Sequence, residues 1–150
     1  MTANIDDIDM KVLDALKENS RATVREISKK INMPITTVHN RLKKLKNQGI
    51  IKKFTIEPDY EKLGKGVTAF IFTVVDHESI GQAENSIEDF KKTMHKLPEV
   101  EKVFAVTGDI DWMLLVRVGS IKELDDFLLR KLRAIKGVVK TTTQIVLEEN

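Results

Sequence analysis

The sequence predicts an α+β protein with an N-terminal winged helix-turn-helix domain and a C-terminal ferredoxin-like βαββαβ domain. The first third of the chain is basic and places apolar residues at helical spacing. The remainder alternates between β-branched runs and amphipathic runs, in the order strand, helix, strand, strand, helix, strand. We expect the helix-turn-helix domain at residues 1–51, a connecting strand and linker at 52–65, and the second domain at 66–150.

Three helices are predicted in the first domain. The first is amphipathic and buries Ile5, Ile8, Val12 and Leu16. Thr23 and Glu26 have the spacing of a capping box, in which each side chain satisfies a backbone N–H group at a helix start, so residues 23–31 form the second helix. Pro34 suits a first helical turn and begins a third helix, residues 34–48, whose inward side chains are Val38, Leu42 and Leu45. The short turn between the last two helices has helix-turn-helix spacing.

The connecting segment has two parts. Residues 50–58, IIKKFTIEP, are predicted to form a strand that acts as a wing or connector, and residues 59–66 are polar with two glycines, which favours a linker. In the second domain, strands are expected at 67–75, 100–108, 112–118 and 138–147, and helices at 79–96 and 120–135. The expected caps of the two helices are Ser79 with Gln82 and Ser120 with Glu123. Their core faces comprise Ile80, Ala83, Ile87, Phe90 and Met94, and Ile121, Leu124, Leu128, Leu132 and Ile135.

Composition excludes several classes of protein. The chain has no cysteine, which excludes disulfides and thiolate metal sites and favours an intracellular, cytoplasmic setting. No run approaches the ~18 apolar residues of a membrane span, so no membrane partner is expected. The acidic N-terminus lacks the apolar centre of a signal peptide.

Basic charge is concentrated in the predicted helix-turn-helix. Residues 25–53 contain nine basic side chains and one acidic one, Glu26, whereas the residues from 66 onward have 11 basic and 14 acidic side chains. A basic module beside a mildly acidic remainder predicts a domain that binds a polyanion, with double-stranded DNA as the partner. The alternatives are a solvated charged face and a small helical dimerisation domain.

The third helix is the predicted recognition helix. Thr36, Asn40, Lys43 and Asn47 lie opposite its apolar face, flanked by Thr37, His39 and Lys44. Asn can read adenine and Lys can reach guanine acceptors. Arg41 falls nearer the buried side, which favours a phosphate contact or an ion pair with an acid of the first helix. The predicted phosphate contacts outside this helix are Lys29, Lys30, Lys52 and Lys53.

These stretches resemble the Lrp/AsnC, or feast/famine, transcriptional regulators. IDDIDMKVLDAL is similar to their L-D-x-x-D-x-x-I-L, SRATVREIS to their A-R-x-S-x-x-E-L-A, and INMPITTVHNRLKKLKNQGII to their L-G-L-S-x-x-x-V-x-x-R-I-x-x-L-x-x-x-G-x-I. Pro34 replaces the usual Ser before the recognition helix, which puts its cap in doubt. Ile31-Asn32 replaces the usual Leu-Gly, and Asn32 also tolerates a left-handed backbone.

The resemblance implies how the second domain works. In the family this domain pairs its sheet with that of a neighbour to make a dimer, dimers often assemble to octamers, and an effector, usually an amino acid, binds between dimers. The apolar residues on both faces of strands 67–75 and 112–118 agree with a sheet that needs a partner. The alternative is a single sheet with an apolar exposed face.

The expected effector site joins the GDIDW turn to the last strand. Gly108 would free backbone N–H groups for a carboxylate, and Asp109 or Asp111 could accept bonds from an ammonium group. Thr141 and Thr143 project to one face of the last strand and Thr142 to the other. A structural turn, and β-propensity alone for the threonines, remain the alternatives.

Catalysis and RNA binding are the competing functions. Asp109 and Asp111 could form a catalytic or metal-binding pair, but no histidine, cysteine or glycine-rich phosphate loop accompanies them, so we expect neither an enzyme nor a metal or other cofactor. RNA binding through the sheet would need aromatic residues on a basic surface. Phe104 is a lone candidate, and this half of the chain is acidic.

Overall fold

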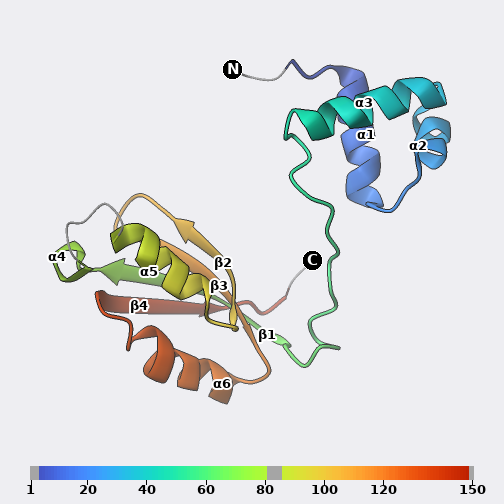
Figure 1. Cartoon of the computed structure of the whole chain (residues 1–150). Coiled ribbons are helices and arrows are strands. Elements are labelled where there is room, and N and C mark those ends of the chain that lie inside the picture. The colour runs from blue at the N-terminus through green and yellow to red at the C-terminus, as the bar shows by residue number, and fades with distance from the viewer. Residues whose placement is uncertain (1–3, 81–85, 149–150) are drawn as a thin grey trace. The chain divides into compact units, whose positions relative to one another are not determined.

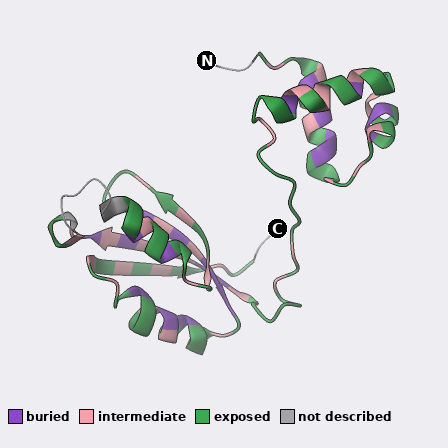
Figure 2. Ribbon diagram, viewed as in Figure 1, coloured by how far each residue is buried: buried purple, intermediate pink, exposed green. Residues whose placement is uncertain are grey.

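The chain forms two compact units, Met1–Glu57 and Pro58–Asn150, which are described separately (Figure 1). The structure, a computed structural model, describes residues 4–80 and 86–148. Each unit has its own apolar core, seen as the buried side chains in Figure 2.

The first unit contains the three predicted helices: α1 at Asp7–Glu18, α2 at Val24–Ile31 and α3 at Ile35–Asn47. The predicted capping box is confirmed, because the N–H of Glu26 donates to Oγ1 of Thr23 over 3.2 Å and the N–H of Thr23 donates to Oε2 of Glu26 over 2.7 Å. Pro34 makes no side-chain cap bond, and Asn32 has the left-handed φ of 52°. The centre of the apolar core consists of side chains that are at most 1% exposed: Val12, Ile27, Val38 and Leu45.

A buried carboxylate ties α3 to α1. Asp9 is 0% exposed, and its Oδ2 atom lies 2.6 Å from the Lys44 ammonium. Arg41 approaches Asp9 at 3.5 Å and the N-cap residue Asp6 at 2.7 Å. Burial opposes ionisation of Asp9, but the hydrogen bond from Lys44, the backbone N–H of Asp6 and the charges of Lys44 and Arg41 outweigh it, so the pKa lies below its ordinary value of 3.8. The orientation of the third helix therefore depends on an electrostatic contact as well as on apolar packing.

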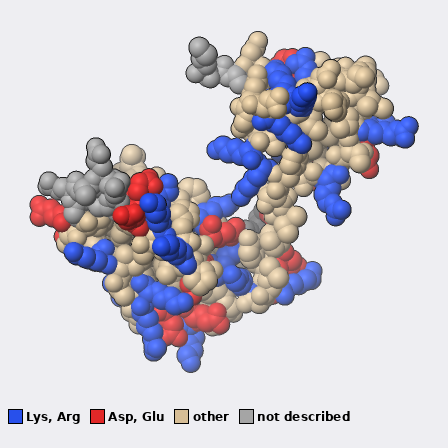
Figure 3. Space-filling model, in the orientation of Figure 1, with Lys and Arg blue, Asp and Glu red and all other residues tan. Residues whose placement is uncertain are grey.

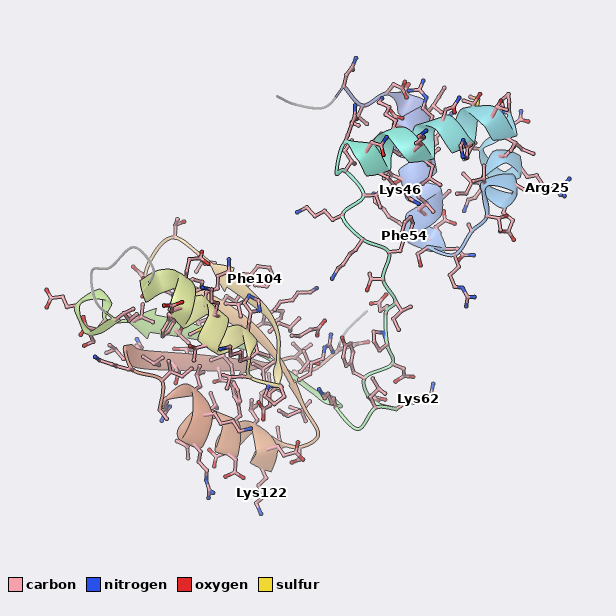
Figure 4. All side chains as sticks on the ribbon, in the orientation of Figure 1. Arg25, Lys46, Phe54, Lys62, Phe104 and Lys122 are labelled. Carbon is pink, nitrogen blue, oxygen red and sulfur yellow. The ribbon has the colours of Figure 1, made fainter. Side chains whose placement is uncertain are left out.

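The strand predicted at residues 50–58 is absent, and that prediction was wrong for the single chain. A β-strand exists through hydrogen bonds to a neighbouring strand, and no described strand pairs with this segment. Side chains fasten it to the first unit instead. The Lys46 ammonium lies 4.9 Å from the centre of the Phe54 ring (Figure 4), and the Ser20 hydroxyl donates to the carbonyl of Thr55 over 3.2 Å.

The second unit confirms the βαββαβ order. Its strands are β1 at Val67–Val75, β2 at Val100–Ala105, β3 at Trp112–Val118 and β4 at Val138–Ile145, and its helices are α4 at His77–Ile80, α5 at Ser86–His95, α6 at Ile121–Asp126 and the π-helix η1 at Phe127–Leu132. The sheet is antiparallel in the order β2-β3-β1-β4. The helices lie on one face of it (Figure 1).

The helices differ from prediction in two places. Ser79 lies inside α4 rather than at a cap, and its hydroxyl bonds to the carboxylate of Asp76, which precedes the helix. Gln82 and Ala83 lie outside the described residues, as does the side chain of Ile87. Ser120 caps α6 as predicted, accepting from the N–H of Glu123 over 3.2 Å.

The helix predicted at residues 120–135 begins as α6 and then changes its winding. From Phe127 it becomes the π-helix η1, whose backbone hydrogen bonds span five residues instead of four. Ile121, predicted to be buried, is 56% exposed, while Phe127 is 1% exposed. The predicted core face therefore started one turn too early at Ile121 and omitted Phe127, which lies three positions after the buried Leu124.

Among the described residues of the second unit, no helix lies over one face of the sheet (Figure 1). Side chains that alternate with the buried ones on β1 and β3 point to this open face, namely Phe70, Phe72, Val74, Met113 and Leu115. Phe104 of β2 extends the apolar surface and is 41% exposed (Figure 4). The predicted apolar character of both sheet faces is confirmed.

Replacing Asp9 by Asn is expected to lower the free energy of unfolding by about 1–2 kcal/mol at neutral pH, because Lys44 and Arg41, each partly in water, lose a charged partner. Because folding lowers the pKa of Asp9, this stabilisation is complete above about pH 4 and is lost as the pH falls through the lowered pKa. Chemical denaturation at about pH 7 and about pH 2 measures it. The control is Asp14→Asn, which removes an exposed ion pair with Lys17. Equal destabilisation by Asp9→Asn at both pH values would refute the ion pair.

Candidate nucleic-acid interface and effector turn

The outer face of α3 has the predicted polar and basic side chains. Thr36, His39, Asn40, Lys43 and Asn47 are exposed and Thr37 is half-buried. Because Val38 and Leu45 on the opposite side are 0% exposed, the helix cannot rotate without losing its core contacts. Lysine and arginine side chains project from this unit in Figure 3. The packing of α3 thus presents hydrogen-bonding groups and positive charge to solvent.

Two of the predicted DNA-binding residues are engaged inside the unit. Arg41 makes the anticipated ion pairs with acids at the start of the first helix, Asp6 and Asp9. Lys44 contacts Asp9 and also donates to the carbonyl of Asn4 over 2.9 Å. Their side chains are 28% and 29% exposed. The charges that hold α3 in place are therefore distinct from the charge of Lys43, which is exposed.

The remaining predicted phosphate contacts lie outside α3. Lys52 and Lys53 are exposed on the segment that follows the third helix. Lys29 and Lys30 are exposed near the end of α2, where Lys30 pairs with Glu18. Such exposed ammonium groups suit sequence-independent contacts with phosphates.

In the second unit, Asp111 shapes the turn between β2 and β3. Its carboxylate Oδ2 accepts from the backbone N–H of Val75 at 2.8 Å, and its own N–H donates to the carbonyl of Thr73 over 2.9 Å. Its carbonyl accepts from the N–H of Val106 at 3.0 Å, just after the end of β2 at Ala105, three residues short of the predicted Gly108. These bonds join the turn to β1 and make Asp111 a structural anchor.

Asp109 has a different environment from Asp111. It is exposed, and within residues 4–80 and 86–148 its carboxylate makes no hydrogen bond or ion pair. Gly108 precedes it with φ of 115°, a backbone conformation that is strained for any residue with a side chain. The two carboxylates therefore do not form a matched acid–base pair, since one is bound to the backbone and the other faces water.

The three threonines lie on the edge strand β4. Thr141 pairs with Thr73 of β1, and its hydroxyl accepts from Nε of Arg133 at 3.2 Å. Thr141 and Thr143 are half-buried and Thr142 is exposed. The N–H of Asp111 bonds to the carbonyl of Thr73, and Thr141 is the register partner of Thr73 on the other side of β1, so Asp111 and Thr141 lie at the same end of the sheet.

A cavity of about 420 Å³ lies between α5 and the residues at and just after the end of η1. None of the predicted effector residues lines it. Its walls are Ile80, Asp89, Phe90, Thr93, Lys131, Ala134, Ile135 and Lys136. The sequence placed Ile80, Phe90 and Ile135 on the core faces of two helices, and no local pattern marked the lining residues as neighbours.

Neither a metal centre nor a membrane span was found in the parts of the chain that the structure describes. No group of three or more His, Cys, Asp or Glu side chains is arranged to hold a metal ion there. No described helix is long and apolar enough to cross a membrane.

Sequence reasoning missed Arg117. This residue lies in β3 and is only 8% exposed, with its guanidinium bonded to side chains of two other strands. The signal was present, because a lone arginine in the apolar run WMLLVRV needs a partner if it is buried.

Comparison with known proteins agrees with this two-unit arrangement. Residues 5–52 match the family model described as "Winged helix-turn-helix DNA-binding", and residues 68–150 match the "Lrp/AsnC ligand binding domain". An uncharacterised HTH-type transcriptional regulator of Pyrococcus horikoshii is 39% identical over 141 residues, which cover 94% of this chain and 91% of that protein.

Solved structures show the same fold over nearly the whole chain. The transcriptional regulator NMB0573 of Neisseria meningitidis, solved as a complex with L-Met, is 30% identical with a TM-score of 0.87, covering 97% of this chain and 92% of that one. LrpC of B. subtilis is 28% identical with a TM-score of 0.83, covering 99% and 98%. The chain belongs to the Lrp/AsnC family: it is a DNA-binding transcriptional regulator with a ligand-binding domain, and not an enzyme.

Proposed function

We propose that the chain binds pseudo-palindromic sites on double-stranded DNA as a dimer, with α3 of each copy in the major groove. The assigned domains are residues 1–51 for DNA binding, 52–65 for the connector and 66–150 for effector binding and assembly, in a cytoplasmic protein. The observation that supports DNA reading is the exposed polar face of α3 over a fully buried opposite face.

The residues of α3 have different proposed roles. Asn40 and Asn47 suit bidentate contacts to adenine, and Lys43 suits guanine or phosphate. Thr36, Thr37 and His39 supply further hydrogen-bonding groups near the start of the helix. Lys52 and Lys53 contact phosphates. Arg41 and Lys44 hold the helix against α1 and reach phosphates only with the exposed part of their side chains.

Lys43→Ala is expected to weaken DNA binding and to lower the slope of log affinity against log salt by about one unit, because one phosphate contact releases about one counterion. Asn40→Ala should instead reduce discrimination between bases, by about 1–3 kcal/mol. Binding is measured by fluorescence anisotropy on a duplex that the wild-type protein selects from a random library. Lys122→Ala in α6 is the charge-matched control. An unchanged salt slope in Lys43→Ala would remove that residue from the interface.

Assembly through the open sheet face is the second part of the proposal. Apolar side chains of β1 and β3 lie there without a covering helix, and large apolar surfaces on soluble proteins usually mark contacts. We infer a dimer that buries this face. Further assembly of dimers into an octamer is proposed on the resemblance to the family.

Phe72→Glu is expected to convert the dimer into a monomer at micromolar concentration, because an unpaired carboxylate would be buried in the apolar contact. Ile121→Glu places the same charge on an exposed residue of the helix layer and should leave the assembly intact. Light scattering with sedimentation velocity measures the molar mass. A Phe72→Glu protein of wild-type mass would rule out this face as the contact.

We further propose an amino acid as the effector. Exposed Asp109 is available for an α-ammonium group, and the N–H groups near Gly108 are available for a carboxylate. Asp111 shapes the turn, and Thr141, Thr142 and Thr143 are candidate contacts from β4. The NMB0573 protein was solved with L-Met, which supports this ligand class. An effector that prefers one assembly shifts the population toward it and so changes DNA binding.

Screening the twenty amino acids by thermal shift is expected to find a ligand that raises the melting temperature by about 5–10 °C at roughly a hundredfold excess over its dissociation constant. Asp109→Ala should abolish that shift while the melting temperature without ligand stays within about 1 °C. Asp111→Ala should lower the ligand-free melting temperature, because the N–H of Val75 loses its acceptor. An undiminished ligand shift in Asp109→Ala would exclude its carboxylate from the site.

A further inference from the structure

A buried arginine lies where the connector meets the sheet. Arg117 is on β3, and its Nε atom donates to Oε2 of Glu101 on β2 over 2.5 Å. One terminal nitrogen donates to the hydroxyl of Thr68 on β1 over 2.8 Å. The ring of Tyr60, which precedes the sheet in the chain, lies 3.8 Å from the guanidinium carbon. We call Tyr60, Thr68, Glu101 and Arg117 the connector clamp.

The connector clamp is the expected arrangement for a buried guanidinium. A charge removed from water needs an opposite charge and hydrogen bonds, which Glu101 and Thr68 provide. The flat face of the guanidinium remains available, and an aromatic ring stacks on it by cation–π attraction, more strongly where water is excluded. Tyr60 is thus attached to three strands through one arginine.

The backbone around Tyr60 is folded into a compact turn. The N–H of Leu63 donates to the carbonyl of Asp59 over 3.2 Å, and that of Lys65 donates to the carbonyl of Tyr60 over 2.8 Å. Gly64, with φ of 72°, lies so close to the end of β3 that a Cβ atom on Gly119 would be 2.7 Å from its carbonyl oxygen. The turn therefore packs on the sheet at two points, through Tyr60 and through Gly64.

The other end of the connector is fastened to the first unit. Lys46 lies against the Phe54 ring and Ser20 bonds to Thr55, as described above. Between Thr55 and Tyr60 remain only residues 56–59, which include Pro58. Proline fixes its own φ and restricts the residue before it, so this short segment has fewer conformations than a glycine-rich linker of the same length.

We propose that Arg117 is a positioning residue that holds the connector on the effector domain through Tyr60, so that motion between the two units is confined to residues 56–59. With this restriction, a change in the packing of effector domains changes the positions of the DNA-binding units. A long flexible linker would not transmit that change. The consequence for DNA rests on the proposed function, whereas the fastening itself does not.

The fastening is tested by spin-label distances in the full chain. The sequence has no cysteine, so Arg25→Cys in α2 and Lys122→Cys in α6 introduce one label in each unit (Figure 4). Dilution with unlabelled chain leaves only distances within one chain. Tyr60→Ala is expected to broaden the distance distribution about 1.7-fold, the square-root scaling of a flexible linker that grows from residues 56–59 to 56–66. Tyr60→Phe, which retains the ring, should keep the wild-type width.

A second pair of variants reaches the same contact from the other side. Gly119→Ala places its Cβ against the carbonyl of Gly64 and should displace the turn and broaden the distribution in the same way. Gly66→Ala, whose Cβ would meet only the Glu61 side chain at 3.7 Å, is its matched control. Wild-type widths in both Tyr60→Ala and Gly119→Ala would overturn the proposal, whatever their melting temperatures.

DNA binding separates this inference from the proposed function. The selected duplex is varied by inserting about 2, 5 and 10 base pairs between its half-sites, since half-site spacing reflects the geometry of the dimer. Wild type and Tyr60→Phe should lose affinity steeply when the inserted base pairs rotate one half-site away from the other. The affinity of Tyr60→Ala should depend less on this spacing, while its affinity for a single half-site should be unchanged. A wild-type protein that binds no DNA would contradict the proposed function alone. Broad distances with an unchanged spacing dependence in Tyr60→Ala would overturn the positioning role.

Discussion

The second unit depends on one constraint: a sheet covered by helices on one face must find another way to bury the other. The strands β1 and β3 are apolar on both sides, and the helices satisfy only the side of Ile71 and Leu114. Phe72 and Met113 lie on the open face. Exposing a large apolar surface to water is unfavourable in free energy, so such a face usually makes a contact. The proposed dimer follows from this constraint, and the connector clamp occupies part of the same face through Arg117.

Electrostatics divides the basic residues of the first unit into two groups. Arg41 and Lys44 neutralise Asp6 and Asp9 at the start of α1, and this contact lowers the pKa of Asp9 despite its burial. Lys43, one residue before Lys44, faces water. Because neighbouring helical positions differ by about 100° around the axis, the adjacent lysines point in different directions, one to solvent and one toward α1. The same side-chain chemistry thus orients α3 against α1 and places positive charge on its exposed face.

Hydrogen bonds distinguish the roles of the two carboxylates in the GDIDW turn. Asp111 gives its carboxylate to the N–H of Val75, so it is an acceptor for the backbone and not a free base. Asp109 remains exposed and available. Two carboxylates near each other in sequence therefore have separate roles, one in the structure of the turn and one proposed for the effector.

The sequence by itself determined the three helices of the first unit, the βαββαβ order of the second, the Thr23–Glu26 capping box and the family, because periodicity, turn residues and caps act over a few neighbouring positions. Only the tertiary structure decided which lysine of α3 turns inward to Asp9, where Arg117 finds Glu101 and Tyr60, and that Asp111 bonds to Val75. It also decided that Phe127, not Ile121, is buried in the helix that ends in η1, and that residues 50–58 lack a pairing strand. These features depend on partners far apart in the chain, and no local pattern encodes which distant groups will meet.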